Sequence, residues 1–76
     1  MKVRIANAYS DGHESERVAL LAEPDVLTED WWDDVALPET GDGHGMDSSL
    51  GYCYTVTILT ASNPAFVGQS REWSGY

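Results

Sequence analysis

The sequence predicts a small α+β domain in which a mostly antiparallel sheet packs against one short helix. Apolar residues alternate along residues 2–9, 14–22 and 52–60, which is typical of strands with one buried face. A helical pattern over about residues 29–36 lies between the second and third of these segments. The predicted order is therefore ββαβ, and residues 69–76 could add a fourth short strand at an edge of the sheet.

The first two strands are expected to form a hairpin closed by Asp11 and Gly12. Asp-Gly at the centre of a two-residue loop favours a type I′ turn, in which both residues have positive φ. With Ser10 opposite His13, apolar side chains face each other across the hairpin, Ile5 with Val18 and Val3 with Leu20. The same register predicts that Lys2, Arg4 and Arg17 share the opposite face of the hairpin.

The helix is expected to begin after Thr28, a candidate N-cap, and to end before Pro38. Leu27, Trp31 and Val35 recur every four residues and predict the face that packs on the sheet. Because neighbouring residues of an α-helix diverge by about 100°, Trp31 and Trp32 do not fit one narrow stripe. We therefore expect one of these two tryptophans to be partly exposed.

Residues 52–60 form the strongest predicted strand, because they are rich in β-branched and aromatic side chains. Tyr52, Tyr54, Val56 and Ile58 are expected on its inner face. A helix that returns the chain would place this strand beside the first one, which gives the sheet order 2-1-3 with the helix on one face. The glycine-rich residues 40–51 are expected to form a long loop, and the C-terminal segment is expected to bury Trp73.

The chain carries 13 Asp and Glu residues against 4 Lys and Arg, a formal net charge of −9 over 76 residues. A surface this negative repels phosphate backbones and anionic lipid headgroups, which argues against direct binding of nucleic acid or membranes. No apolar segment approaches the ~20 residues needed to cross a bilayer, and Cys53 is the single cysteine. Length and composition predict one domain, residues 1–76, in the cytoplasm, either a monomer or a small homo-oligomer.

Acidic residues concentrate on the predicted helix, where no Lys or Arg balances them between Arg17 and Arg71. A basic partner surface would relieve the repulsion among these charges and accelerate the encounter. We therefore expect a non-enzymatic interaction module that binds a basic surface of a host protein through Glu29, Asp30, Trp32, Asp33 and Asp34. Two other interpretations stay open: a nucleic-acid mimic that inhibits a host nuclease or regulator, and an acidity that serves solubility alone.

The triplet Asp-Gly-His occurs twice, at residues 11–13 and 42–44, and offers a weaker alternative. His13, Asp42, His44 and Asp47 could converge on one metal ion. Their spacing does not match a recurring zinc or calcium motif, so the primary expectation is that the protein binds no metal and no cofactor. No serine lies in a nucleophile-elbow sequence and Cys53 lies in the middle of a predicted strand, so no catalytic residue is expected.

Three further segments carry a resemblance to known proteins. They are Gly-Asp-Gly-His-Gly-Met-Asp-Ser (41–48), Leu-Gly-Tyr-Cys-Tyr-Thr-Val-Thr-Ile (50–58) and Phe-Val-Gly-Gln-Ser-Arg-Glu-Trp-Ser-Gly (66–75). These segments are similar to stretches of small uncharacterised proteins of actinobacteria and their bacteriophages. The resemblance implies a small accessory protein of a bacteriophage or mobile element that works in a bacterial cytoplasm. It implies no catalytic or binding residue.

Overall fold

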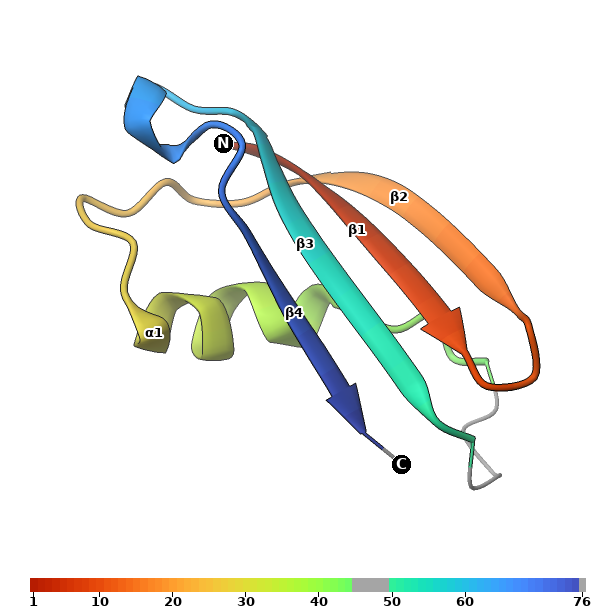
Figure 1. Cartoon of the computed structure of the whole chain (residues 1–76). Coiled ribbons are helices and arrows are strands. Elements are labelled where there is room, and N and C mark those ends of the chain that lie inside the picture. The colour runs from red at the N-terminus through yellow and green to blue at the C-terminus, as the bar shows by residue number, and fades with distance from the viewer. Residues whose placement is uncertain (45–49, 76) are drawn as a thin grey trace.

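Four strands form one antiparallel sheet in the computed structural model, which describes residues 1–44 and 50–75 (Figure 1). The strands are β1 (Lys2–Tyr9), β2 (Glu14–Leu20), β3 (Tyr52–Thr60) and β4 (Ser70–Gly75), and their order across the sheet is β2-β1-β3-β4. The predicted α+β class and the predicted 2-1-3 order are confirmed, and β4 extends the sheet beyond β3. Residues 45–49, the centre of the predicted loop, lie outside the described residues.

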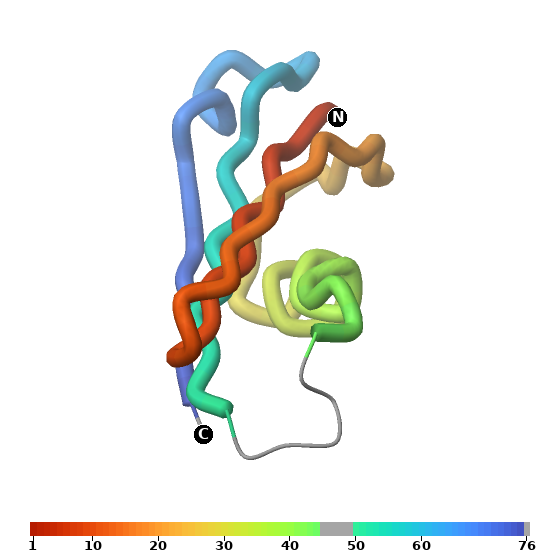
Figure 2. Tube along the Cα trace, turned by 90° about the vertical axis from the view of Figure 1, so that its right-hand side faces the viewer, coloured from red at the N-terminus to blue at the C-terminus, as the bar shows by residue number. Residues whose placement is uncertain are grey.

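One helical segment covers a single face of this sheet (Figure 2). It runs without interruption through α1 (Glu29–Trp31), the π turn η1 (Trp32–Ala36) and the 3-10 turn η2 (Leu37–Glu39). Thr28 caps it as predicted, because its Oγ1 accepts a hydrogen bond from the Trp31 N–H at 3.1 Å. The segment does not end before Pro38, because this residue lies near the start of η2. A proline is tolerated there, since the N–H that it lacks would have no partner within the turn.

Both tryptophans of this segment are buried, Trp31 at 7% and Trp32 at 5% exposure, so the expectation that one of them is partly exposed is wrong. The Leu37 N–H donates to the Trp32 carbonyl, an i→i+5 bond. The rotation about the helix axis from one residue of the π turn to the next is therefore smaller than in an α-helix, where it is about 100°. Ala36 consequently faces the sheet and is fully buried, whereas Val35, which the sequence placed on the packing stripe, is exposed.

The rest of the core comes from the inner face of the two central strands. Val3 and Ile5 of β1 and Val56 and Ile58 of β3 are the largest fully buried side chains, as predicted from their alternation. Phe66 closes the end of the core from the 3-10 turn η3 (Pro64–Phe66). Edge-to-face contact between Trp31 and Trp32, with ring centroids 5.0 Å apart, fills the space between helix and sheet.

The hairpin differs from the prediction by one residue of register. Ile5 is opposite Arg17, and Val3 is opposite Ala19. The Tyr9 N–H donates to the His13 carbonyl at 2.9 Å, and the Gly12 N–H donates to the Tyr9 carbonyl at 3.0 Å. Gly12 has φ of +92°, and no non-glycine residue described has positive φ. The connection is therefore a three-residue loop, a type I turn followed by a left-handed glycine, and the predicted type I′ turn is wrong.

A shift of one residue moves every side chain of β2 to the other face of the sheet. Arg17 faces the helix, so the predicted grouping of Lys2, Arg4 and Arg17 on one face is wrong for Arg17. Val18 and Leu20 lie on the face away from the helix, where they are 56% and 78% exposed. No helix or strand of the described residues covers that face, as the edge-on view in Figure 2 shows. Within the same described ranges, no helix has the length and apolar composition of a membrane span.

Candidate functional site

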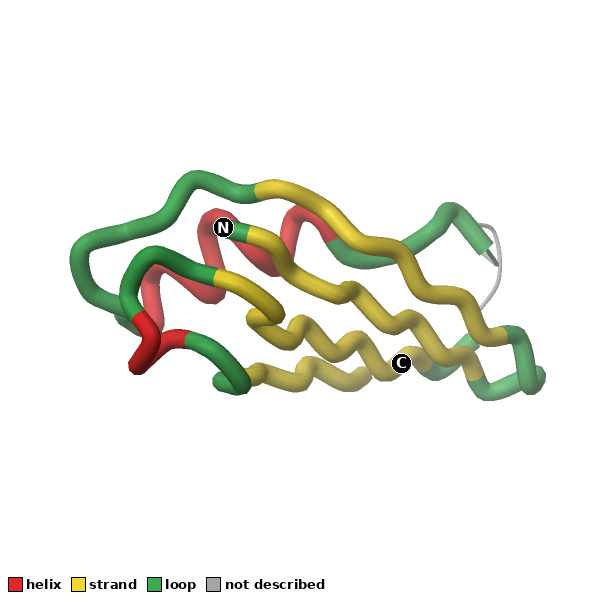
Figure 3. The backbone as a smooth tube through the Cα atoms, turned by 90° about the horizontal axis from the view of Figure 1, so that it is seen from above, coloured by secondary structure: helices red, strands yellow, loops and turns green. Residues whose placement is uncertain are grey.

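Two arginines fix the helical segment to the edge strands of the sheet. Arg71 of β4 forms an ion pair with Glu29 at the start of the segment. Arg17 of β2 binds Glu39 at its end, with Nη2 3.1 Å from Oε2 and 2.7 Å from the Glu39 carbonyl oxygen. These pairs place the helix diagonally between β4 and β2, a path that Figure 3 shows from above. Arg17 and Arg71 are thus each paired with a carboxylate of the helical segment.

The solvent side of the helical segment carries three exposed carboxylates, Asp30, Asp33 and Asp34, called here the acidic helix face. No ion pair to any of them occurs among residues 1–44 and 50–75. Asp33 accepts a hydrogen bond from the indole N–H of Trp73 at 3.2 Å. Of the five residues that the sequence assigned to partner binding, these three are available to a partner. Glu29 is paired with Arg71, and Trp32 is buried because the π turn directs it to the sheet.

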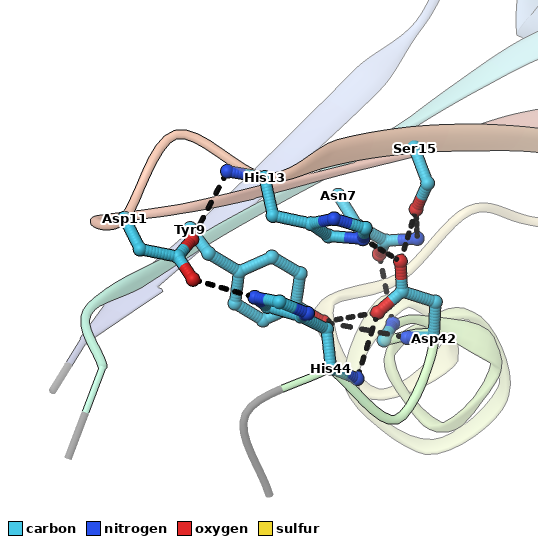
Figure 4. Close-up of polar contacts among 8 residues, drawn as sticks. Asn7, Tyr9, Asp11, His13, Ser15, Asp42 and His44 are labelled. Carbon is cyan, nitrogen blue, oxygen red and sulfur yellow. Dashed lines mark hydrogen bonds and ion pairs between the residues drawn. The ribbon is translucent and has the colours of Figure 1, made fainter. Parts of the chain in front are cut away.

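A second cluster joins the hairpin turn to the chain that follows the helix. The two Asp-Gly-His triplets exchange partners: His13 Nε2 lies 2.9 Å from Asp42 Oδ2, and His44 Nε2 lies 2.7 Å from Asp11 Oδ2 (Figure 4). Within each triplet the backbone N–H of the histidine donates to Oδ1 of the aspartate in the same triplet at 3.0 Å. We call these four residues, Asp11, His13, Asp42 and His44, the His–Asp clasp.

The two imidazole rings of the clasp stack, with centroids 3.8 Å apart and planes 13° from parallel. Both glycines of the triplets have positive φ, +92° for Gly12 and +83° for Gly43, which turns each chain so that its histidine reaches the other triplet. An ionised carboxylate only accepts hydrogen bonds, so the Nε2 of each histidine carries the proton and donates. The repeat of the triplet in the sequence was visible, but its reciprocal pairing depends on the fold.

Asp42 is the most heavily hydrogen-bonded carboxylate of the clasp. It accepts from the Ser15 hydroxyl at 2.5 Å, the His44 N–H at 3.0 Å, His13 Nε2 at 2.9 Å and the Tyr9 hydroxyl at 3.0 Å. These donors, Ser15 first, hold the pKa of the Asp42 carboxyl far below its usual range. The hydrogen bonds from His44 and from the His13 N–H lower the pKa of Asp11 in the same way. Both carboxylates therefore stay ionised at neutral pH.

Asn7, Ser15 and Tyr9 support the clasp and were missed at the level of the sequence. Asn7 is 3% exposed, and its Oδ1 accepts from the Gly41 N–H at 2.8 Å while its Nδ2 donates to Ser15 Oγ at 3.3 Å. Burial raises the pKa of the Tyr9 hydroxyl to about 12. The available signal was the position of Asn7, a polar residue on the otherwise apolar face of the first strand.

Each histidine of the clasp has one ring nitrogen, Nε2, in a hydrogen bond to a carboxylate. A donating Nε2 offers no lone pair to a metal ion, so only the Nδ1 of each ring could ligate one. No group of three or more His, Cys, Asp and Glu side chains in the described part of the chain could hold a metal ion. Asp47, the fourth residue of the predicted metal set, lies outside the described residues. Ser15 donates its proton to a carboxylate of very low pKa, which is too weak a base to activate a nucleophile.

An aromatic hollow of about 350 Å³ lies beside the clasp. Its lining includes Tyr9, Tyr52, Tyr54 and His44. The rings of Tyr52 and Tyr54 stack with centroids 4.6 Å apart, and Tyr52 covers Gly75, where an added Cβ would come within 2.8 Å of its hydroxyl oxygen. The ring faces by which Tyr52 and Tyr54 stack are thus not open to a ligand.

Comparison of the chain with protein families, with curated proteins and with solved structures finds no match to any of them.

Proposed function

We propose that the protein is a small, non-enzymatic interaction module that binds a basic surface of another protein through Asp30, Asp33 and Asp34. The observation that carries the proposal is the distribution of positive charge on the helix side. Arg17 and Arg71 are paired with Glu39 and Glu29, so no aspartate of the acidic helix face forms an ion pair among the described residues. A partner that supplies Lys or Arg would relieve the repulsion among these aspartates and be attracted over a distance of about 8 Å at physiological salt.

The stability of the helix does not require all of these acids. A carboxylate in the first turn favours the helix by interaction with the helix dipole, which accounts for Asp30. Asp33 is held by the Trp73 indole. Asp34 lies one turn beyond Asp30 and repels it, an i,i+4 like-charge pair that costs a few tenths of a kcal/mol. A binding role explains why that repulsion is present, and the same argument removes Glu29 and Trp32 from the predicted docking set.

The test compares two variants that have equal net charge. Asp30→Lys with Asp34→Lys raises the net charge from −9 to −5, because each replacement adds two units. Asp33 is left unchanged to keep its hydrogen bond to Trp73. The control variant, Ser70→Lys with Glu72→Lys and Ser74→Lys, also reaches −5, but its lysines lie on β4 and point away from the helix. Lysine on an edge strand is well tolerated.

Each protein is immobilised and exposed to an actinobacterial lysate, the source that the sequence resemblance suggests. We expect the unmodified chain and the β4 control to retain the same stoichiometric partner, and the helix variant to lose it. Association measured with the purified partner should then slow for the helix variant and become less sensitive to salt. Equal loss in both variants would mean that net charge alone matters, and equal retention would exclude the acidic helix face. Displacement of the partner by duplex DNA would identify its basic surface as a nucleic-acid site and favour the mimic.

A further inference from the structure

The open face of the sheet has two ends of opposite character on the β1–β2 hairpin. At one end, Lys2 and Arg4 of β1 lie across from Leu20 and Val18 of β2. At the end nearer the turn, Ala8 and Ala6 of β1 lie across from Glu14 and Glu16 of β2. All eight side chains point away from the helix, because they alternate with the core residues of β1 and their partners. One end is therefore bulky and positive, and the other is small and negative.

The small end is hollowed. A depression of about 360 Å³ has a lining that includes Ala6, Ala8, Glu14, Glu16, Cys53 and Thr55. Alanine methyl groups form its floor where the neighbouring strands carry longer side chains. At the other end, Val18 and Leu20 project from the same face and are the apolar residues that the fold leaves most open there, at 56% and 78% exposure. A solvated sheet face usually carries polar residues at such positions.

We propose that this face binds a second copy of the same chain in a two-fold dimer. A two-fold axis between the sheets, perpendicular to the strands and level with Ile5 and Arg17, reverses the hairpin end for end. The Lys2–Leu20 end of one copy then lies over the Ala8–Glu14 end of the other, and the Arg4–Val18 pair lies over the Ala6–Glu16 pair. On this axis each strand lies over its own copy, so Lys2 and Arg4 lie over Ala8 and Ala6 of the second copy, one strand away from its Glu14 and Glu16. Each positive end therefore meets a negative end.

The dimension of the sheet allows these contacts. Neighbouring strands are about 4.8 Å apart, so the long side chains of Lys2 and Arg4 can reach the glutamates of the second copy on the adjacent strand. Packed sheets are separated by about 10 Å, and the helical segment that carries the acidic helix face lies on the other side of its own sheet. Repulsion between the acidic helix faces of the two copies is therefore largely screened at 0.15 M salt, where the Debye length is about 8 Å. The acidic helix face stays free in the dimer, so this inference does not depend on the proposed function.

The proposal is tested by exchanging charges between the two ends. One variant, Lys2→Glu with Arg4→Glu, has two negative ends, and a second variant, Glu14→Lys with Glu16→Lys, has two positive ends. Each should be monomeric alone, because like ends would meet. An equimolar mixture should form a heterodimer, because both junctions then join opposite charges. The first variant loses four charge units and the second gains four, so the mixed pair has the same total charge as two unmodified copies.

Sedimentation equilibrium in 0.15 M salt up to about 1 mM protein measures each species. Two strands of eight and seven residues cover roughly 25 Å by 10 Å, which is less than the area of about 800 Å² that each partner buries in a standard interface. We therefore expect the unmodified chain to dimerise weakly, with a dissociation constant on the order of 100 µM. Leu20→Ser should weaken that association at least about tenfold, since it removes the most exposed large apolar side chain of this face. Circular dichroism confirms that each variant is folded.

The variant Asp30→Lys with Asp34→Lys is the matched control, because it alters charge on the opposite side of the molecule. It should dimerise at least as well as the unmodified chain. A monomer mass for the unmodified chain at every concentration would overturn the proposal. So would a mixture of the two exchange variants that stays monomeric, or a dimer that survives in each exchange variant alone.

Discussion

Replacement of Gly12 by valine tests the geometry of the hairpin turn and, through it, the register of β2. Gly12 has φ of +92°, and an added Cβ would find no atom within 4 Å. The change therefore places the new Cβ in open space and tests mainly the backbone conformation. A residue held in a disfavoured conformation of this kind costs about 1–3 kcal/mol, with a β-branched side chain at the upper end. Loss of a glycine also reduces the conformational entropy of the unfolded chain, which stabilises the folded state by about 0.4–1 kcal/mol and offsets part of this cost.

The expected net destabilisation for Gly12→Val is about 2 kcal/mol. For a domain of this size, that corresponds to a fall in melting temperature of roughly 10 °C, from about 4–8 °C for each kcal/mol. Gly12→Asn is the matched variant, because asparagine tolerates the left-handed region. It should change stability by less than about 1 kcal/mol. Thermal and urea unfolding, followed by tryptophan fluorescence, measure both changes.

Two results would refute this reasoning. An unchanged melting temperature for Gly12→Val would mean that the turn does not require positive φ at this position. Equal losses for valine and asparagine would mean that side-chain volume matters, in conflict with the open space around Gly12. Either result would remove the three-residue loop that sets Tyr9 opposite His13, and with it the observed register.

Three further predictions concern the clasp and the single thiol. The folded-state pKa values of Asp11 and Asp42 lie below their unfolded values, so these groups stabilise the fold above about pH 4 and lose this effect as the pH falls further. The melting temperature of Asp42→Asn should therefore lie below that of the unmodified chain at pH 7 and approach it at pH 2–3. Zinc or EDTA should leave the melting temperature unchanged, whereas a zinc-dependent rise that His44→Ala abolishes would support the metal alternative, since a ligand of the native state must stabilise it. Burial and the nearby Glu72 carboxylate raise the pKa of the Cys53 thiol. A disulfide reagent at pH 8 should therefore react more slowly with the native chain than with the urea-unfolded chain. Glu72→Gln should make the reaction of the native chain faster.

Those elements of the fold whose signals are local could be predicted from the sequence. Alternation along residues 52–60 placed Val56 and Ile58 in the core, and Thr28 caps the helical segment that follows it. The sheet order followed from the short connections and the position of the helix. In each case a few neighbouring residues carry the information, and tertiary contacts reinforce it.

The candidate site was predictable only in part, because its geometry depends on contacts between distant residues. His13, His44 and Asp42 were recognised as a possible cluster, but the reciprocal pairing requires the hairpin turn and residues 40–44 to meet. Trp32 was assigned to a partner because an α-helix was assumed, and a π turn is not visible in the pattern of apolar residues. The pairing of Glu29 with Arg71 could not be predicted, because Arg71 lies in a strand far from Glu29 in the sequence.

The error of one residue in the hairpin shows how a turn determines the chemistry of both faces of the sheet. In the predicted register, Val18 and Leu20 would face the helix and Arg17 would lie on the open face. The end of the helical segment would then lose the cation that binds Glu39, and the open face would lose its apolar side chains. With the three-residue loop, Arg17 instead neutralises Glu39, which leaves the uncompensated charge on Asp30, Asp33 and Asp34. A left-handed Gly12 thus connects the local conformation of the chain to the acidic helix face on one side and to the open hairpin face on the other.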